Sequence, residues 1–201
     1  MKKRKSEYRR KTRETDIAVN LCIDGSGVSG ISSGIGLLDH LLELFAFHGL
    51  FDLKMTAKGD IKKVDMHHTN EDIGLVLGEA FAKALLLKKG IRRFGWAIVP
   101  MEEVVAQVAI DINGRGYFNG IQFDGKPVIK KEDYSFAYAD HFFESFAKKL
   151  GMNLHISLRS ATADMHTNLE PVFKAFGLAL DQATQIDCRR KGVPSTKGVI
   201  D

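Results

Sequence analysis

Hydrophobic and polar residues follow two different spacings along this chain, and each spacing predicts one type of secondary structure. In some stretches β-branched and other apolar residues alternate with polar ones, as expected of strands with one buried face. Stretches of this kind lie at 17–23, 51–57, 104–112 and 154–158. In others apolar residues recur every three or four positions, which is typical of helices that bury one face. These stretches lie at 37–45, 73–87, 142–150 and 172–183.

Two sequence blocks recur in the second half of the chain. DHLLE at 39–43 returns as DHFFE at 140–144, 101 residues later. DMHHTNE at 65–71 returns as DMHTNLE at 164–170, 99 residues later. Two matched blocks at nearly the same offset indicate an internally duplicated domain.

Each half mixes strands and helices at short intervals, so the predicted fold class is α+β. We expect each half to be a β-sheet with two helices on one face. A glycine follows seven residues after the glutamate of each second block, at Gly78 and Gly177. The predicted organisation is a basic N-terminal arm (1–13), a first repeat (14–92), a second repeat (93–185) and a C-terminal tail (186–201).

Composition and charge narrow the class of protein. Of 201 residues, 44% are hydrophobic and 27% charged, as in ordinary globular domains. No apolar run reaches the about 18 residues of a membrane span, and no apolar segment follows the basic N-terminus as in a secretory signal. The arm holds eight of the 29 Lys and Arg residues, and the rest has 21 basic against 24 acidic residues. We therefore predict neither a membrane nor a nucleic-acid partner.

Two cysteines, Cys22 and Cys188, are the only ones in the chain. This number rules out a disulfide scaffold and fits a reducing, cytoplasmic location.

Histidines are concentrated in the repeated blocks. Five of the seven lie there, namely His40, His67, His68, His141 and His166. His67 with Glu71, and His166 with Glu170, are i, i+4 pairs, which one helical turn places side by side. Imidazole and carboxylate together form a ligand set for a divalent transition metal. No thiolate accompanies them, which argues against a structural zinc site.

Helix capping is the competing explanation for these blocks. Thr69-x-x-Asp72 and Thr167-x-x-Glu170 both fit the capping box. The two boxes are out of register by one position when the repeats are superposed, whereas the histidines and glutamates are in register. Capping therefore does not account for the repetition.

Motifs spread over residues 12–199 resemble those of the imidazoleglycerol-phosphate dehydratase family. The motifs are GIGLLDH at 34–40, HGLFD at 48–52, HHTNED at 67–72, RFG at 93–95, DINGR at 111–115, FKAF at 173–176 and PSTKG at 194–198. The resemblance implies the dehydration of D-erythro-imidazole glycerol phosphate to imidazole acetol phosphate in histidine biosynthesis. It also implies a duplicated fold of the ribosomal protein S5 domain 2-like type, two Mn²⁺ per site, and a shell of 24 identical subunits with sites between subunits.

The same resemblance implies roles for individual residues. The metal ligands would be His40, His67, His68, Glu71, His141, His166 and Glu170. The substrate-binding residues would be Glu14, Arg93, Arg115, Ser195, Thr196 and Lys197. Glu14 would also be the catalytic acid/base, acting with His67, Glu71, His166 and Glu170. Thr167 stands where the family has a second histidine, so one of the two manganese ions is expected to lose a ligand.

These residue types suit the reaction. A metal pair on the imidazole ring helps to expel the adjacent hydroxyl group, a carboxylate takes the proton, and Arg and Lys suit a phosphate dianion. Two other functions use similar ligands. A metal-binding assembly protein with impaired catalysis would explain Thr167, and a metal-dependent hydrolase would leave 195–198 without a role.

Overall fold

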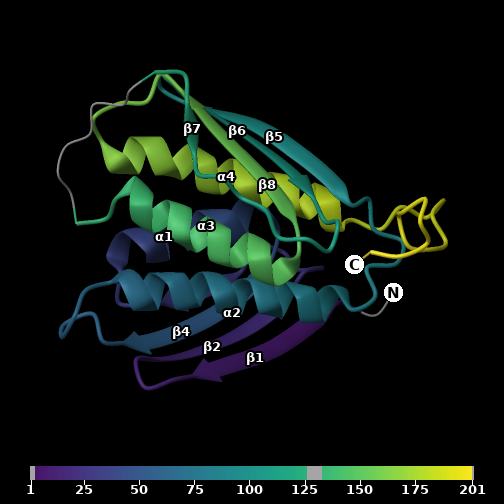
Figure 1. Cartoon of the computed structure of the whole chain (residues 1–201), viewed down its shortest axis with the longest axis horizontal. Coiled ribbons are helices and arrows are strands. Elements are labelled where there is room, and N and C mark those ends of the chain that lie inside the picture. The colour runs from purple at the N-terminus through teal and green to yellow at the C-terminus, as the bar shows by residue number, and fades with distance from the viewer. Residues whose placement is uncertain (1–2, 126–132, 201) are drawn as a thin grey trace.

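We describe residues 3–125 and 133–200 of a computed structural model, whose elements form two similar halves (Figure 1). The first half contains β1 (Lys5–Lys11), β2 (Thr15–Cys22), β3 (Ser29–Ser32), α1 (Gly36–His48), β4 (Asp52–Gly59) and α2 (His67–Leu85). The second contains β5 (Phe94–Met101), β6 (Val104–Asp111), β7 (Gln122–Phe123), α3 (Phe136–Leu150), β8 (Asn153–Arg159) and α4 (Met165–Thr184). Both halves follow the same order of elements, which confirms the duplicated α+β fold.

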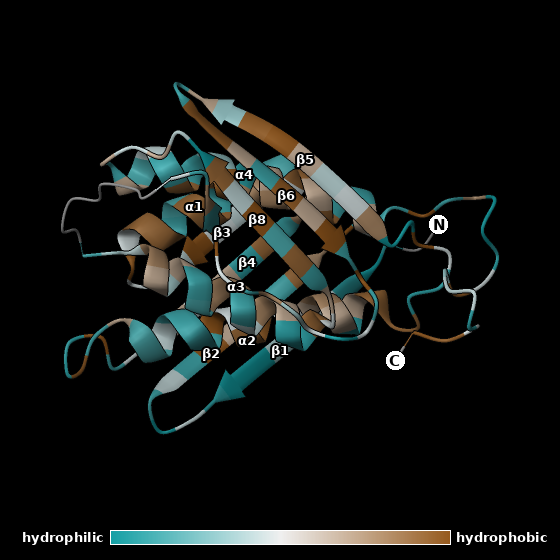
Figure 2. Ribbon diagram, turned by 45° about the horizontal axis from the view of Figure 1, so that its top comes forward, coloured by the Kyte–Doolittle hydropathy of each residue, from teal (hydrophilic) through white to brown (hydrophobic). Residues whose placement is uncertain are grey.

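Each half forms a four-stranded sheet, ordered β1-β2-β4-β3 and β5-β6-β8-β7. Neighbouring strands are antiparallel, except that β3 runs parallel to β4 and β7 runs parallel to β8. The four helices lie between the two sheets (Figure 1). Figure 2 shows β1 as hydrophilic throughout, whereas β5 and β6 carry many hydrophobic residues.

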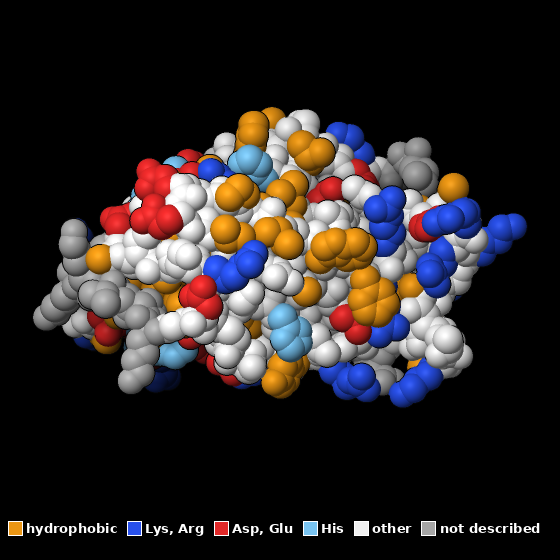
Figure 3. Space-filling view, turned by 90° about the horizontal axis from the view of Figure 1, so that it is seen from above, with side chains coloured by type: hydrophobic (Ala, Val, Ile, Leu, Met, Phe, Trp, Pro, Cys, Tyr) orange, Lys and Arg blue, Asp and Glu red, His pale blue; other side chains and the backbone are white. Residues whose placement is uncertain are grey.

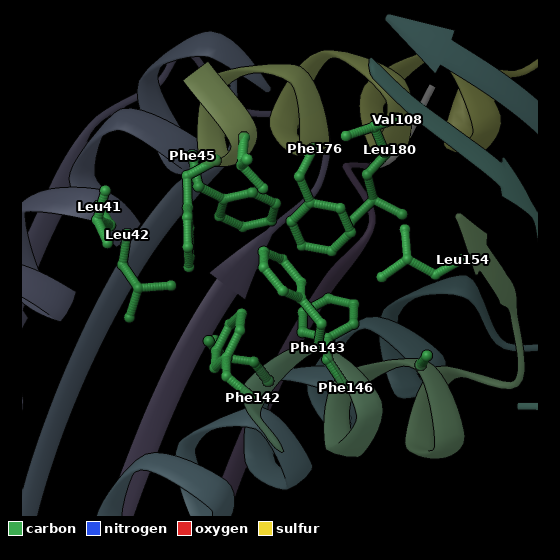
Figure 4. Packing of buried hydrophobic residues seen from close by; sticks show 14 of the residues in the cluster. Leu41, Leu42, Phe45, Val108, Phe142, Phe143, Phe146, Leu154, Phe176 and Leu180 are labelled. Carbon is green, nitrogen blue, oxygen red and sulfur yellow. The ribbon is translucent and has the colours of Figure 1, made fainter. Parts of the chain in front are cut away.

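Phenylalanine side chains from both halves form the centre of one shared core. Figure 4 shows Phe45 of α1 close to Phe142, Phe143 and Phe146 of α3 and to Phe176 of α4. The rings of Phe45 and Phe176 stack with centroids 5.0 Å apart. Since a buried aromatic ring removes a large apolar area from water, this core ties the two halves into one folding unit.

The repeated glycines set the closest helix crossings between the halves. A Cβ at Gly78 of α2 would lie 2.5 Å from the carbonyl oxygen of Phe146 in α3. A Cβ at Gly177 of α4 would lie 2.5 Å from the carbonyl oxygen of Phe45 in α1. Only glycine permits these approaches, so α2 packs on α3 and α4 packs on α1 in equivalent ways.

Residues 5–11 of the predicted basic arm belong to the first sheet. They form β1, which pairs with β2 from Lys5 opposite Cys22 to Lys11 opposite Asp16. The Ser6 hydroxyl donates to the carbonyl of Ala80 in α2 at 2.7 Å. The sequence pattern missed this strand because nearly every position in it is polar or charged.

The predicted capping boxes are wrong, because both helices begin earlier than the boxes require. Thr69 lies inside the first turn of α2, where the Asp65 carboxylate accepts from the N–H of His67 at 2.7 Å. Asp164 caps α4 by accepting from the N–H of Thr167 at 2.7 Å.

None of the described helices is long and apolar enough to cross a membrane.

Candidate active site

The helix crossing of α1 and α4 assembles one cluster of potential ligands, His40, His166 and Glu170. The Oε2 atom of Glu170 lies 2.8 Å from Nε2 of His166 and 3.4 Å from Nε2 of His40. The two imidazole rings stack with centroids 5.0 Å apart. One donor atom from each residue lies within 4.8 Å of the other two. Two imidazole nitrogens and a carboxylate at this spacing fit a divalent transition metal.

Lys174 holds the carboxylate of this first cluster. Its Nζ donates to Oε1 of Glu170 at 2.5 Å, one helical turn further along α4. Burial by itself raises the pKa of Glu170, but hydrogen bonds from Lys174, His40 and His166 more than offset it and lower the pKa to about 2. The carboxylate is therefore ionised at neutral pH and ready to accept a cation. Sequence reasoning missed Lys174, although its i, i+4 spacing from Glu170 was a usable signal.

The crossing of α2 and α3 assembles a second cluster from His67, Glu71 and His141. Nε2 of His67 lies 3.6 Å from Oε2 of Glu71, and the ring centroids of His67 and His141 lie 4.7 Å apart. Nδ1 of His141 is buried and has no hydrogen-bond partner within residues 3–125 and 133–200. A buried nitrogen of this kind is expected to have a partner, and a metal ion would provide one. By repeat alignment, this cluster is the counterpart of the first.

The positions next to these ligands differ between the repeats. His68 turns away from the second cluster, because adjacent residues on a helix point about 100° apart, and its Nδ1 lies 3.1 Å from Oδ2 of Asp60. Thr167 holds the equivalent position and donates its hydroxyl to Oδ2 of Asp164 at 2.7 Å. Asp60 therefore orients the imidazole of His68, whose side chain is partly exposed, whereas Thr167 stabilises the start of α4.

Glu14 lies near His68, in the exposed turn between β1 and β2. Its N–H donates to Oγ1 of Thr12 at 3.1 Å. The pKa of His68 is raised, chiefly by its hydrogen bond to Asp60 and with a smaller contribution from the Glu14 charge. The structure thus brings the predicted acid/base to the same end of the molecule as the ligand clusters.

Arg93 connects the start of β5 to the C-terminal tail. Its guanidinium forms a bidentate pair with Asp111, with Nε–Oδ1 at 2.5 Å and Nη2–Oδ2 at 2.9 Å. Nη1 donates to the carbonyl of Pro194 at 3.0 Å. Burial opposes ionisation, but the hydrogen bonds to Asp111 dominate and raise the pKa of Arg93. Asp111 thus orients Arg93, and Arg93 in turn anchors the tail that carries Ser195, Thr196 and Lys197.

Arg115 lies in the turn after β6, where its N–H donates to Oδ1 of Asn113 at 2.8 Å. The tail itself turns back at Ser195, whose Oγ accepts from the N–H of Lys197 at 3.2 Å. Thr196 and Lys197 are exposed, and Ser195 is half-buried. The predicted phosphate-binding residues therefore include a turn that presents the exposed, positively charged side chain of Lys197.

The length of α4 separates the two groups of predicted site residues. His166 lies at the beginning of α4, whereas the N–H of Arg93 donates to the carbonyl of Ala183 near its end, at 2.9 Å. A helix of 20 residues is about 30 Å long. Figure 1 shows the tail at the end of the molecule opposite to the start of α4. One chain therefore does not bring its ligand clusters and its tail to the same small molecule.

Comparison with known proteins identifies clear relatives. Residues 33–180 match the family model described as imidazoleglycerol-phosphate dehydratase. Proteins of that name from Methanocella arvoryzae and Thermoanaerobacter pseudethanolicus are 49% and 48% identical, each over 98% of this chain and 100% of the relative. The crystal structure of IGPD from Pyrococcus furiosus in complex with (S)-C348 has a TM-score of 0.79 at 34% identity, over 96% of this chain and 99% of that one. The Staphylococcus aureus enzyme of that name has a TM-score of 0.73 at 31% identity, over 90% and 99%.

The Asp60–His68 pair predicts a pH-dependent property of the folded chain. Asp60→Asn removes the main cause of the raised pKa, so the pKa of His68 falls toward its ordinary value of about 6.5. Because the folded state favours the charged imidazole, the pair stabilises the fold below that ordinary pKa and loses its effect as pH rises through the folded-state pKa. NMR titration of the metal-free protein measures the change.

Asp65→Asn is the control for this titration. Asp65 contributes only a smaller charge effect to His68, so its replacement lowers the pKa less. An unchanged pKa in Asp60→Asn contradicts the assigned pair.

Proposed function

Because this chain belongs to the imidazoleglycerol-phosphate dehydratase family, we propose that it is a metal-dependent hydro-lyase that converts D-erythro-imidazole glycerol phosphate to imidazole acetol phosphate. The activity places the enzyme in histidine biosynthesis. The observation that carries the metal dependence is the pair of equivalent His–His–Glu clusters, one at each crossing between the halves. Neither cysteine is in a disulfide within the described residues, which supports a cytoplasmic location.

We propose that the two clusters hold two Mn²⁺ ions. His40, His166 and Glu170 would bind one ion, and His67, Glu71 and His141 the other. When bound, the ions would act as Lewis acids toward the imidazole ring of the substrate. The pre-ionised Glu170 and the unpartnered Nδ1 of His141 support this assignment.

Glu14 moves the proton in the proposed reaction. The imidazole carries the carbon that loses the hydroxyl group, and the neighbouring carbon must lose a proton. Glu14 lies in an exposed turn close enough to His68 for its charge to raise the pKa of that imidazole, which supports assigning the proton transfer to this carboxylate. The proton therefore passes to an oxygen of Glu14, a typical general-base role. The hydroxyl group leaves and is released as water, the electron pair of the C–H bond forms the double bond of an enol, and the enol tautomerises to the ketone of the product.

The phosphate of the substrate is assigned to the tail and its neighbours. Lys197 supplies an exposed point charge, and Ser195 and Thr196 supply hydroxyl donors. Arg93 keeps the tail in place through Pro194 while its pair with Asp111 orients the guanidinium. Arg115 lies on the turn after β6 and completes the proposed cationic group.

A complete site requires more than one chain. The clusters and the tail lie at opposite ends of α4, about 30 Å apart, so the tail of one chain would serve the clusters of another. This separation supports a homo-oligomer with sites between subunits, and the family resemblance gives 24 as the expected number. We assign to His68, whose side chain is partly exposed and lies outside both clusters, the role of a ligand to a metal ion in a neighbouring chain.

Thr167 makes the two metal ions unequal. Where the first repeat has His68, the second offers a hydroxyl that is already bonded to Asp164. One ion therefore lacks one protein ligand and is bound more weakly. The alternative function, a metal-binding assembly protein with impaired catalysis, rests on this residue alone.

Glu14→Gln tests the acid/base role. The amide keeps the size of the side chain but is no longer a base, so kcat falls about 10²–10⁴-fold while substrate still binds. Turnover and substrate binding are measured separately at saturating Mn²⁺. Glu7→Gln, on the exposed face of β1, is the control and keeps normal turnover. Near-normal kcat in Glu14→Gln shows that the base is another carboxylate.

Thr167→His tests the unequal metal ions. The added imidazole completes the ligand set, so the weaker of two Mn²⁺ binding steps tightens by calorimetric titration. The wild-type protein should show two steps of different affinity. If the variant and the wild type give the same two affinities, a water molecule or another residue already fills that position.

Mixed oligomers test whether sites are shared. His166→Ala and Lys197→Ala are each expected to turn over poorly below the wild-type KM. When they are co-expressed, some sites combine an intact cluster from one chain with an intact tail from another, and activity recovers. Co-expression of His166→Ala with Glu170→Gln is the control, because both changes damage the same cluster. Absence of recovery in the first pair contradicts shared sites.

A further inference from the structure

A buried carboxylate follows the proposed ligand Glu71 directly in α2. Asp72 is 8% exposed, and its Oδ2 accepts from the hydroxyl of Thr15 at 2.5 Å. Nη1 of Arg10 in β1 lies 2.5 Å from the same oxygen. Adjacent residues of a helix point about 100° apart, so Glu71 and Asp72 have different neighbours. This part of α2 therefore supplies both a residue of the second cluster and a contact to the first two strands.

The contact ends at the turn that carries Glu14. Thr15 is 3% exposed, and its N–H donates to Oγ1 of Thr12 at 3.0 Å, while the N–H of Thr12 donates to the carbonyl of Thr15 at 2.8 Å. Oγ1 of Thr12 also accepts from the N–H of Glu14 at 3.1 Å. The backbone on both sides of Glu14 is thus tied to a buried threonine whose hydroxyl is bonded to Asp72. We call Asp72, Thr15 and Arg10 the Asp72 anchor.

The second half lacks this anchor. Strand pairing and the repeated blocks align the two halves position by position. The three equivalent residues are all apolar, namely Val104 for Thr15, Pro171 for Asp72 and Val99 for Arg10. Because the second sheet packs on α4 without the three polar groups, the duplicated fold does not require them.

The turn of the second half nevertheless carries a carboxylate at the position equivalent to Glu14. This residue is Glu103, which directly precedes β6 as Glu14 directly precedes β2. Glu103 and its neighbour Glu102 are exposed, and Figure 3, viewed onto the outer side of this half, shows acidic side chains gathered at one end. The Asp72 anchor therefore accompanies only one of two equivalent glutamates, the one to which we assign the proton transfer.

We propose that Asp72 is a positioning residue for Glu14. It holds the turn between β1 and β2 against the beginning of α2, directly through Thr15 and also through Arg10 in β1. Glu14 thereby keeps a fixed place relative to the helix that carries the second cluster. The inference rests on the proposed function in one respect, because it takes Glu14 as the group that accepts the proton.

Thr15→Val tests the anchor with a residue that the second half already has at the equivalent position. The variant loses the hydroxyl but nearly keeps the shape of the side chain, and Asp72 retains Arg10 as a partner, so we expect it to fold. Since a misplacement of about 1 Å can cost about 10²-fold in rate, kcat should fall by on the order of 10–10²-fold. KM and Mn²⁺ affinity should stay unchanged, because no ligand or phosphate-binding residue is altered.

Three further variants complete this test. Asp72→Ala removes the shared partner of Thr15 and Arg10 and should lower kcat at least as much as Thr15→Val. Thr15→Ser keeps the hydroxyl and should retain most of the activity. Thr56→Val makes the same change on an exposed position of β4 and should keep the wild-type kcat.

Double variants separate positioning from a general loss of structure. In Glu14→Gln the proton acceptor is already absent, so the addition of Thr15→Val should lower kcat no further. Glu103→Gln makes the same amide change in the turn without an anchor. In that background Thr15→Val should still cause its full loss of kcat.

Hydrogen exchange measures the anchor without turnover. The amides of Thr12, Glu14 and Thr15 all donate within the turn. Mass spectrometry of the metal-free protein should show faster exchange in a peptide covering 12–15 for Thr15→Val and Asp72→Ala, but not for Thr15→Ser.

Three results would overturn the proposal. They are a wild-type kcat in Thr15→Val, a further loss when it is added to Glu14→Gln, and unchanged exchange of the 12–15 peptide. Failure of the proposed function differs from all three, because the wild-type chain itself would then not dehydrate imidazole glycerol phosphate. The exchange measurement would still show whether Asp72 holds the turn.

Discussion

The close crossing of helices from opposite halves is the contact on which the rest of the molecule depends. Gly78 and Gly177 let α2 approach α3, and α4 approach α1, at backbone-to-backbone distance. Each crossing places a histidine of one half beside the His–Glu pair of the other. Neither half holds a complete cluster, so the packing of the two halves determines the geometry of each cluster. The phenylalanine core keeps both crossings in place at once (Figure 4).

The length of α4 then determines how far the clusters lie from the residues of the tail. The clusters lie at the beginning of α2 and α4, and the residues proposed to bind phosphate lie at the far end of α4. A rigid helix cannot shorten this distance, and this is the reason for proposing that sites are shared between chains.

Duplication gave two equivalent clusters, and later differences made them unequal. Glu170 has a hydrogen bond from a lysine one turn away, whereas the counterpart position of Lys174 in the first repeat is Leu75. His68 is oriented by Asp60, whereas Thr167 stabilises the start of its own helix. The repeat therefore preserves the histidines and glutamates that a single chain brings together and varies the residues around them.

The sequence by itself determined the duplication and the fold class, and it predicted the ligand types, because periodicity and repeated blocks are local properties of the chain. It also identified the family through motifs at fixed spacing. It did not predict β1, which is charged at most positions and is held as a strand by its pairing with β2. Only the tertiary structure decided that His40 joins Glu170 while His141 joins His67. Only the tertiary structure showed that Lys197 lies far from the clusters. Distances between segments far apart in sequence depend on how helices cross and how long they are.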